Sequence, residues 1–524
     1  MNNKKIKNFV IVGGGTAGWM TAAAFARLVG CERYTLTLIE SDHIGTVGVG
    51  EATLPHLRFF NQRLGISEPD FLKATNATFK AGIEFANWGA IGDAYIHPFG
   101  DYGSSIRNVG FHHYWLKAKS LGLNDKIDEY SLPVKFCQAG KFDFPSDDER
   151  SIKSTYSYAY HIDAGLYAKF LRSFCEDLGV KRVEGQVEHV QTHSSTGEIE
   201  KLTLKNGDVI EGDFFIDCSG FRSLLLGKTL DVKFESWKHW LPCDRAVAAP
   251  TENNQAPLPY TRATAYDAGW QWKIPLQHRA GNGYVYASDF LGDDRAESDF
   301  KSRLDGPPLK DPIKLRFEAG RRVKSWQKNC VAIGLSSGFL EPLESTSIYL
   351  IQIAIMKLME LFPSGEEQNL NSVSSEFNRL MANEYERTRD FLILHYHATT
   401  RDDTDFWNYV RTMSIPDSLT QKMELFKSKA YVSPYAHGLF LEPSWIAVYL
   451  GQGVIPEGFD RRIEALPSQG LLSQLEKFRT NITDKVAAMP EHQFLIDQFC
   501  SGTAATLAKA ADASMSLYGV RRNG

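Results

Sequence analysis

The chain has 524 residues, of which 43% are hydrophobic and 23% charged, and its formal net charge is −5. These values are typical of a globular protein with two to four lobes, and they argue against a nucleic-acid-binding protein. The apolar run at residues 9–12 ends in glycines and is too short for a signal peptide, and no stretch approaches membrane-spanning length. Seven scattered cysteines without a CxxC pair indicate reduced thiols, a cytoplasmic protein and no metal site.

A glycine-rich turn follows the first expected strand. Residues 9–12 form a short β run, residues 13–18 read GGGTAG, and an alanine-rich helix is expected through about Val29. A second β run, residues 34–39, ends on Glu40. In this setting GxGxxG is a dinucleotide-binding pattern, because the glycines let the backbone approach a pyrophosphate at the helix N-terminus. Glu40 can accept hydrogen bonds from ribose hydroxyls and disfavours a 2′-phosphate, so the sequence predicts FAD or NAD.

Later segments are expected to extend this module. Residues 45–53, GTVGVGEAT, are flexible enough to pass close to a cofactor, with a plain loop as the alternative. Asn206 and Gly207 predict a hairpin, and residues 214–217 predict a buried strand of the nucleotide-binding sheet. A strand ending at Ile333, a turn and a buried helix from about Thr346 follow. The N-terminus of this helix can hold a small anion, with an ordinary N-cap as the alternative.

Residues 78–88, TFKAGIEFANW, are interpreted as a helix. Phe79, Ile83 and Ala86 would share one face, and Lys80 and Glu84, four residues apart, could simply pair on the surface.

The segment WQWKIP at residues 270–275 is expected to be a strand, followed by hairpin turns over residues 277–283. Its alternating tryptophans form either core packing or a wall beside an aromatic cofactor. The pattern beyond about Pro363 is mainly helical, and residues 400–404 are interpreted as a helix cap with a salt-bridge cluster.

Together these motifs resemble the flavin-dependent tryptophan halogenase family. The resemblance rests on GGGTAG at 13–18, GVGEAT at 48–53, FK at 79–80, HPFG at 97–100, HYW at 113–115, DCSG at 217–220, WQWKIP at 270–275, FLEPLEST at 339–346 and TTRDDTDFW at 399–407. WxWxIP and EPLEST are specific to that family among flavin enzymes, whereas the glycine fingerprint is not.

The resemblance implies an FAD-dependent halogenase that uses FADH2, O2 and a halide to make hypohalous acid. Lys80 would bind this oxidant as a haloamine or polarise it by hydrogen bonding, and an indole- or phenol-type substrate would then be halogenated. Glu344 would stabilise the cationic ring intermediate and take its proton, and Ser345 would orient its neighbours. Thr346 and Ser347 would hold the halide.

The resemblance also implies the remaining site residues. Those for FAD are Gly13, Gly14, Gly15, Thr16, Ala17, Gly18, Glu40, Gly48, Val49, Gly50, Ala52, Val187, Gly334, Leu335 and Ile348. Those for the substrate are Ile83, His97, Phe99 and Trp445. A barrier that keeps substrate away from the reacting flavin would consist of Trp270, Trp272, Ile274 and Pro275.

The chain departs from the family pattern at two places. Ser347 stands where the family has glycine, so bromide or iodide is expected in preference to chloride. The tyrosine pair, glutamate and Phe-Trp pair that grip the amino acid part of tryptophan have no clear counterpart. An electron-rich aromatic other than free tryptophan is therefore the expected substrate.

The expected fold is α/β, with an FAD-binding Rossmann-like body of the flavin monooxygenase type, a β-sheet substrate wall and a mainly helical C-terminal lobe. The body spans residues 1–362, with its nucleotide-binding module at about 1–60, 165–225 and 325–362 and the substrate sheet at about 61–164 and 226–324. Residues 363–524 form the lobe that covers the substrate site.

The expected partners are a separate NAD(P)H-dependent flavin reductase, O2, a small aromatic substrate and further copies of the chain in a homo-oligomer; nucleic acid and membranes are not expected. Two alternatives are an aromatic hydroxylase with flavin, in which Lys80 and Glu344 are structural, and a flavin-binding protein without turnover.

Overall fold

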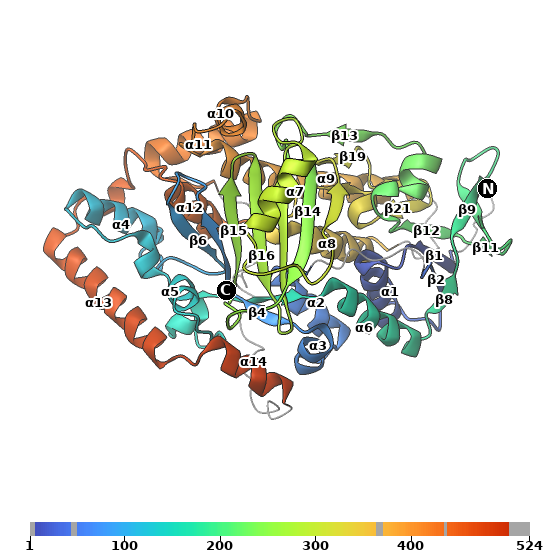
Figure 1. The fold of residues 1–524 in the computed structure, drawn as a ribbon, viewed down its shortest axis with the longest axis horizontal. Coiled ribbons are helices and arrows are strands. Elements are labelled where there is room, and N and C mark those ends of the chain that lie inside the picture. The colour runs from blue at the N-terminus through green and yellow to red at the C-terminus, as the bar shows by residue number, and fades with distance from the viewer. Residues whose placement is uncertain (1–5, 43–49, 363–369, 434–437, 502–524) are drawn as a thin grey trace. The chain divides into compact units, whose positions relative to one another are not determined.

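The computed structural model describes residues 6–42, 50–362, 370–433 and 438–501, and its elements are labelled in Figure 1. The chain divides into two compact units that each combine three stretches of sequence. Unit 1 consists of residues 1–76, 162–244 and 316–386, and unit 2 of residues 77–161, 245–315 and 387–524. The expected division into a body of residues 1–362 and a lobe of residues 363–524 stays a prediction.

Unit 1 is organised around a six-stranded sheet in the order β20-β21-β12-β1-β2-β8. Its strands are β1 (Asn8–Val12), β2 (Thr35–Glu40), β8 (Lys181–Glu184), β12 (Phe214–Asp217), β20 (Trp326–Gln327) and β21 (Cys330–Ala332). All neighbours are parallel except β20 and β21. The nearly continuous apolar runs of β1 and β12 suit strands of a parallel sheet that are buried on both faces. The strands expected at residues 9–12, 34–39 and 214–217 and the strand expected to end at Ile333 are thereby confirmed as members of one sheet.

Helices of unit 1 pack beside this sheet. They are α1 (Thr16–Leu28), α2 (His56–Leu64), α3 (Glu68–Thr75), α6 (Ala164–Asp177) and α8 (Thr346–Glu360). Helix α1 contacts α2, α6 and α8. Unit 1 also holds β3 (Glu51–Ala52) and a small sheet of β13 (Phe234–Ser236), β19 (Gly320–Arg322) and β22 (Gly338–Phe339).

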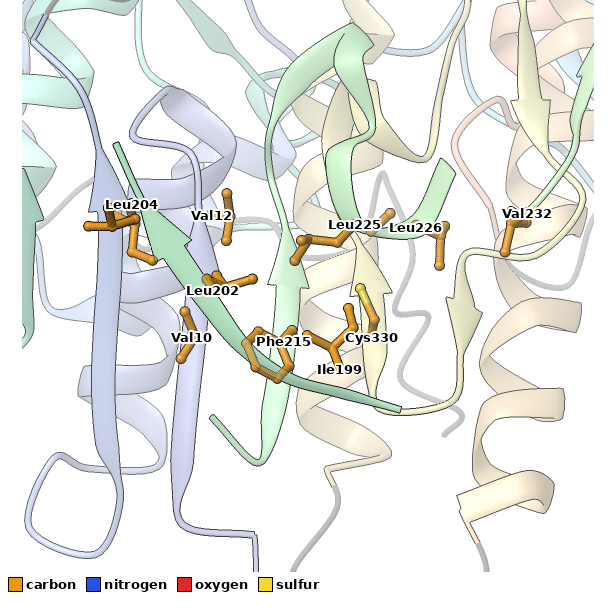
Figure 2. Close-up of a cluster of buried hydrophobic side chains, with 12 residues drawn as sticks. Val10, Val12, Ile199, Leu202, Leu204, Phe215, Leu225, Leu226, Val232 and Cys330 are labelled. Atoms are coloured by element: carbon orange, nitrogen blue, oxygen red, sulfur yellow. The ribbon is translucent and has the colours of Figure 1, made fainter. Parts of the chain in front are cut away.

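The predicted hairpin at Asn206 and Gly207 lies outside the six-stranded sheet. It joins β10 (Ile199–Leu204) to β11 (Val209–Glu211), and with β9 (Val187–Thr192) these strands form a separate antiparallel sheet. Figure 2 shows why it packs there: Ile199, Leu202 and Leu204 meet side chains of β1, β12 and β21 in one buried cluster. Only one face of β10 is apolar, so the hairpin covers the sheet instead of extending it.

Unit 2 contains a seven-stranded sheet in the order β18-β14-β17-β16-β15-β5-β6. Its strands are β5 (Gly82–Ala86), β6 (Ala94–Pro98), β14 (Arg245–Thr251), β15 (Tyr260–Tyr266), β16 (Gly269–Pro275), β17 (Ala280–Tyr286) and β18 (Ile313–Arg316). The expected strand at WQWKIP is confirmed as β16. The turn after it is shorter than expected, because β17 already begins at Ala280. Gly283 belongs to β17, where the Trp272 ring occupies the space of a side chain: a Cβ there would lie 2.1 Å from it.

The helix expected at residues 78–88 is wrong. These residues form β4 (Thr78–Lys80) and β5, and β4 pairs antiparallel with β7 (Ala159–Ile162). Residues 78–83 are buried without a break, so burial shows no helical spacing, and the pairing of β5 with β15 and β6 keeps the chain extended.

The remaining helices confirm the mainly helical pattern beyond Pro363. They are α9 (Leu370–His397), α10 (Asp405–Thr412), α11 (Asp417–Lys429), α12 (Glu442–Gly451), α13 (Ser468–Ala488) and α14 (His492–Cys500), in addition to α4 (Phe111–Ser120), α5 (Leu132–Gln138) and α7 (Asp293–Ser302) earlier in the chain. The expected cap and ion pair are confirmed at Thr404, which caps α10, and between Arg401 and Asp403. Among the described residues no helix has both the length and the apolar character needed to cross a membrane.

Candidate active site

The glycine turn between β1 and α1 is crowded at Gly13 and Gly18 but leaves free space at Gly15. At Gly13, with φ of 119°, a Cβ would lie 2.2 Å from the Cys218 carbonyl oxygen, and at Gly18 it would lie 1.8 Å from the Gly13 carbonyl oxygen. At Gly15, the N-cap of α1, no atom of the described residues lies within 4 Å of such a Cβ. Within the described part of the chain no side chain caps α1, and its first turn contains no acidic residue. An N-terminus without such a cap suits the pyrophosphate of a dinucleotide.

Glu40 lies directly against this turn. A Cβ on Gly14 would be 1.6 Å from Glu40 Oε2, so only glycine fits. Trp19 Nε1 donates to Glu40 Oε2 at 3.2 Å, and Arg182 Nε donates to Oε1 at 2.5 Å. Arg172 Nη1 adds a longer bond of 3.4 Å to the same oxygen. Sequence reasoning missed both arginines, because they lie more than a hundred residues from Glu40 and belong to no motif.

The other residues expected to bind FAD lie at several different places in unit 1. Gly334, with φ of 78°, brings its Cα close to α1 and α8: a Cβ there would lie 3.0 Å from Ala17 Cβ and 3.3 Å from Ile351. Ile348 is buried in the first turns of α8, and Leu335 is 36% exposed. Val187 instead packs against the hydrophobic cluster of Figure 2.

Two further expected FAD residues, Gly50 with φ of 81° and Ala52 in β3, are described. Gly48 and Val49 lie outside the described residues. The glycine turn, Glu40 and Gly334, which lies against Ala17 of α1, form a cradle in unit 1 that suits a dinucleotide.

The N-terminus of α8 has an unusual backbone. Glu344 and Ser345 both adopt left-handed conformations, with φ of 63° and 60°. Such conformations are uncommon for residues other than glycine and concentrate at functional sites. Glu344 is buried, and the Ser345 side chain makes no capping bond to α8. The alternative of an ordinary N-cap is therefore wrong.

Thr346 follows at the first position of α8. It is 0% exposed, and within the described part of the chain its hydroxyl oxygen has no hydrogen-bond partner. The first turn of α8 contains no acidic residue. An unsatisfied buried hydroxyl beside the positive end of a helix dipole is a site where a small anion is stabilised. Ser347, half-buried in the same turn, can supply a second hydroxyl.

Lys80 lies in unit 2, at the end of β4, and is 0% exposed. Its Nζ lies 4.9 Å from the centre of the Phe99 ring, which gives the ammonium an aromatic neighbour. Glu84 is bound instead by Arg262, whose Nε donates to Glu84 Oε1 at 2.5 Å. The alternative in which Lys80 and Glu84 form a surface pair is therefore wrong.

Two buried histidines hold the strand of Lys80. Thr78 Oγ1 lies 2.9 Å from His161 Nδ1, and the Phe79 amide donates to His492 Nε2 at 3.2 Å. Burial, with the nearby charge of Lys80 as the next cause, holds the pKa of His161 well below its usual range. Burial also lowers the pKa of His492 to about 4. Both rings are therefore neutral at physiological pH.

The expected substrate residues of unit 2 form one aromatic region. Ile83 on β5 lies opposite His97 on β6, and the His97 ring is 5.8 Å from Phe391 and 6.3 Å from Phe440. The Trp445 ring is 5.2 Å from Phe391, which stacks on Phe440 at 3.8 Å. Phe391 was missed, because a buried phenylalanine in a long helix carries no signal of function.

The expected barrier residues lie together on β16. Trp270 and Trp272 are buried, with ring centres 6.1 Å apart, and Ile274 is buried beyond them. The Pro275 carbonyl at the end of the strand accepts a hydrogen bond from Thr78 Oγ1 at 2.7 Å. The barrier strand is thereby joined to the strand that carries Lys80.

Comparisons with known proteins agree with this geometry. A sequence model described as tryptophan halogenase matches residues 8–468. Tryptophan 6-halogenase SttH from Streptomyces toxytricini is 39% identical over 491 residues, which cover 87% of this chain and 91% of that protein. Tryptophan 7-halogenase RebH from Lentzea aerocolonigenes is 34% identical over 501 residues, covering 88% and 92%.

Solved structures give the same result. Xcc4156, a flavin-dependent halogenase from Xanthomonas campestris, superimposes with a TM-score of 0.91 at 46% identity, covering 95% of this chain and 99% of that one. BrvH, a flavin-dependent halogenase from Brevundimonas sp. BAL3, gives 0.90 at 45% identity, covering 94% and 99%. The chain therefore belongs to the tryptophan halogenase family and is a flavin-dependent halogenase, an enzyme whose family implies FAD as cofactor and a halide as co-substrate.

Proposed function

We propose that this enzyme halogenates an electron-rich aromatic substrate of indole or phenol type, with Lys80 as the residue that carries the halogen. The observation that supports this best is the uncapped N-terminus of α8, where the buried Thr346 hydroxyl has no hydrogen-bond partner in the described part of the chain. The overall reaction balances as FADH2, O2, halide, a proton and Ar–H giving FAD, Ar–X and two waters. Reduced FAD supplies the two electrons that O2 needs.

The cradle in unit 1 supports FAD as the cofactor. The first amides of α1 would bind the pyrophosphate, and Glu40 would accept hydrogen bonds from the adenosine ribose. Gly50, Ala52, Gly334, Leu335 and Ile348 would line the rest of the site, with Val187, Gly48 and Val49 as further expected contacts. Because only one dinucleotide fingerprint occurs in the sequence, the reduced flavin would come from a separate NAD(P)H-dependent reductase.

The halide would bind at the N-terminus of α8. Thr346 and Ser347 would supply hydroxyls, and the first amides of the helix would supply partial positive charge. A serine side chain in place of glycine changes the donors and volume of the site. This is the reason that bromide or iodide is proposed in preference to chloride.

Hypohalous acid would react at Lys80. A neutral amine would displace hydroxide from the halogen, giving an N–X bond and water; the aromatic ring would then attack the halogen, and the N–X electron pair would return to nitrogen. Alternatively the ammonium would donate a hydrogen bond that polarises hypohalous acid. In both cases Glu344 would take the ring proton, a general-base role, and Ser345 would orient it. The complete burial of Lys80 supports either role, because water would otherwise compete for the halogen.

The aromatic region of unit 2 supports a flat apolar substrate. Ile83, His97, Phe99 and Trp445 would bind it, and Trp270, Trp272, Ile274 and Pro275 would form the barrier. Phe391 and Phe440 complete the lining. Free tryptophan is not proposed, because the expected grip on its amino acid part is missing from the sequence. A homo-oligomer in the cytoplasm completes the proposal.

The test is a mass-spectrometric assay. Purified protein, FAD, a flavin reductase, NADH and air are given a panel of indoles and phenols with chloride, bromide or iodide. The proposal predicts halogenated products that vanish in Lys80→Ala but persist in Lys314→Ala, a matched change at an exposed lysine on β18. FAD binding is checked in each variant.

A gain of one oxygen with every halide would instead indicate an aromatic hydroxylase. FAD binding without any product from the wild type would indicate a flavin-binding protein without turnover. Equal activity of Lys80→Ala and wild type would reject the role of Lys80.

A further inference from the structure

A chain of buried hydrogen bonds connects four strands of unit 2 beside Lys80. Thr78 Oγ1 donates to the Pro275 carbonyl at 2.7 Å and lies 2.9 Å from His161 Nδ1. His161 Nε2 lies 2.9 Å from Thr261 Oγ1. The chain thus runs from β15 through β7 and β4 to the end of β16, and His161 and Thr78 within it are 0% exposed.

The direction of these bonds defines the tautomer of His161. Thr78 has a single hydroxyl proton, which is given to Pro275, so Thr78 Oγ1 must accept from His161 Nδ1–H. His161 Nε2 is then the acceptor and Thr261 the donor. The neutral ring therefore uses both nitrogens, one as donor and one as acceptor, and neither is left to take a proton from Lys80.

The register places this ring near Lys80. His161 lies directly opposite Thr78, and Ala159 lies opposite Lys80. Thr78 and Lys80 are two residues apart and project from the same face of β4. His161 and Lys80 are thus diagonal neighbours on one face of an antiparallel pair, where Cα atoms are about 7–8 Å apart.

We propose that His161 is a positioning residue for Lys80, which it keeps in one orientation by joining β4 to the sheet that carries the barrier and substrate residues. This inference rests on the proposed relay role of Lys80. The ring serves as a neutral connector and not as a proton acceptor. His492 supports the same strand from its other side through the Phe79 amide, and its Nδ1 donates to the Pro257 carbonyl at 2.7 Å.

The neutrality of His161 has an electrostatic reason. A protonated ring would place a second positive charge near Lys80 and would turn the Nε2 acceptor into a donor, which reverses the bond to Thr261. The titratable groups that act on His161 are Lys80 on β4 and His492 on α14. Removal of the Lys80 charge should therefore make His161 easier to protonate.

The first test measures where the halogen goes. Wild type, His161→Phe and His161→Gln are assayed for halogenated product per FADH2 oxidised, while a scavenger dye reports hypohalous acid that escapes. His161→Phe should lose product about 10- to 100-fold, because a misplaced reacting group costs that much. Escaped hypohalous acid should rise, and FAD affinity should not change. In His161→Gln the amide can donate to Thr78 and accept from Thr261, so its loss should stay below about fivefold.

Controls separate positioning from general destabilisation. His193→Phe, a matched change at an exposed histidine in unit 1, should behave as wild type. If His161→Phe only melts earlier, with an unchanged ratio of product to escaped hypohalous acid, the inference is wrong. If the wild type gives no halogenated product at all, the proposed function fails. The second test then still decides whether His161 is the neutral connector described above.

The second test reads the ring directly by ¹⁵N NMR of histidine-labelled protein, with His161→Gln for assignment. His161 should be neutral and protonated on Nδ1 at pH 7, and Lys80→Met should raise its pKa. A ring protonated on Nε2, or an imidazolium at pH 7, would overturn the inference. So would a His161 pKa that Lys80→Met leaves unchanged.

Discussion

Replacement of Thr346 by valine should stabilise the protein without halide and weaken halide binding. The hydroxyl oxygen is buried without a hydrogen-bond partner among the described residues, and valine has nearly the same shape without the polar atom. A buried unsatisfied polar group costs about 1–3 kcal/mol, so the free energy of unfolding in halide-free buffer should rise by about that amount. A hydrogen bond to a charged group is worth about 1.5–3 kcal/mol, so the bromide concentration for half-maximal activity should rise about 10- to 150-fold.

The assay combines chemical denaturation in halide-free and bromide buffers with the bromide dependence of product formation. Thr75→Val is the matched control in unit 1, because the buried Thr75 hydroxyl already donates to the Phe71 carbonyl at 2.7 Å. That variant should lose about 0.5–1.5 kcal/mol and keep its bromide dependence. If Thr346→Val lost stability like Thr75→Val, or kept the wild-type bromide dependence, the anion site at α8 would be refuted.

Four further substitutions probe the cradle and His492. Gly14→Ala should destabilise the FAD-free protein by about 1–3 kcal/mol, because the new Cβ would collide with Glu40. Gly15→Ala should leave the stability of the FAD-free protein unchanged and should weaken FAD binding in fluorescence titrations. Glu40→Gln should weaken FAD binding about tenfold but not FMN binding, since FMN lacks the adenosine ribose. The pKa of His492 is about 4 in the folded protein, against 6.5 for an exposed histidine. This residue should therefore contribute stability above pH 6.5 that is lost as the pH falls toward 4. In denaturation curves, His492→Asn should reduce the pH dependence of the free energy of unfolding in this range by about one proton.

Three outcomes would contradict these predictions about Glu40 and His492. Equal stability of Gly14→Ala and Gly15→Ala would show that Glu40 does not rest on the turn. A parallel loss of FAD and FMN affinity in Glu40→Gln would indicate general disruption. An unchanged acid slope in His492→Asn would show that this ring titrates as an exposed one.

Local patterns of the sequence predicted the elements that depend on nearby residues. The β1 strand, the glycine turn, α1 and β2 follow from an apolar run, three glycines and an alanine-rich segment within the first forty residues. The sequence also predicts a helix that begins at about Thr346, and α8 begins at this residue. These features need little outside their own segment, because backbone clashes and helix propensity act over a few residues.

The strand pair around Lys80 shows where local patterns mislead. The spacing of Phe79, Ile83 and Ala86 fits a helix, but the chain is extended, since β4 and β5 gain hydrogen bonds from β7 and β15. Those partners lie about eighty and about one hundred and eighty residues away in the sequence. Long-range pairing overrides a local period in such short segments.

By itself, the sequence determined the kind of chemistry: the motifs that bind a dinucleotide, and those that resemble halogenases, are short strings whose residues act through their own backbone or side chains. Only the tertiary structure decided the electrostatic setting of these residues. Burial of Lys80, the neutral state of His161, the arginines on Glu40 and the unsatisfied hydroxyl of Thr346 each depend on neighbours from distant segments. The physical reason is that solvent exclusion and charge interactions follow distance in space, which a linear sequence does not contain.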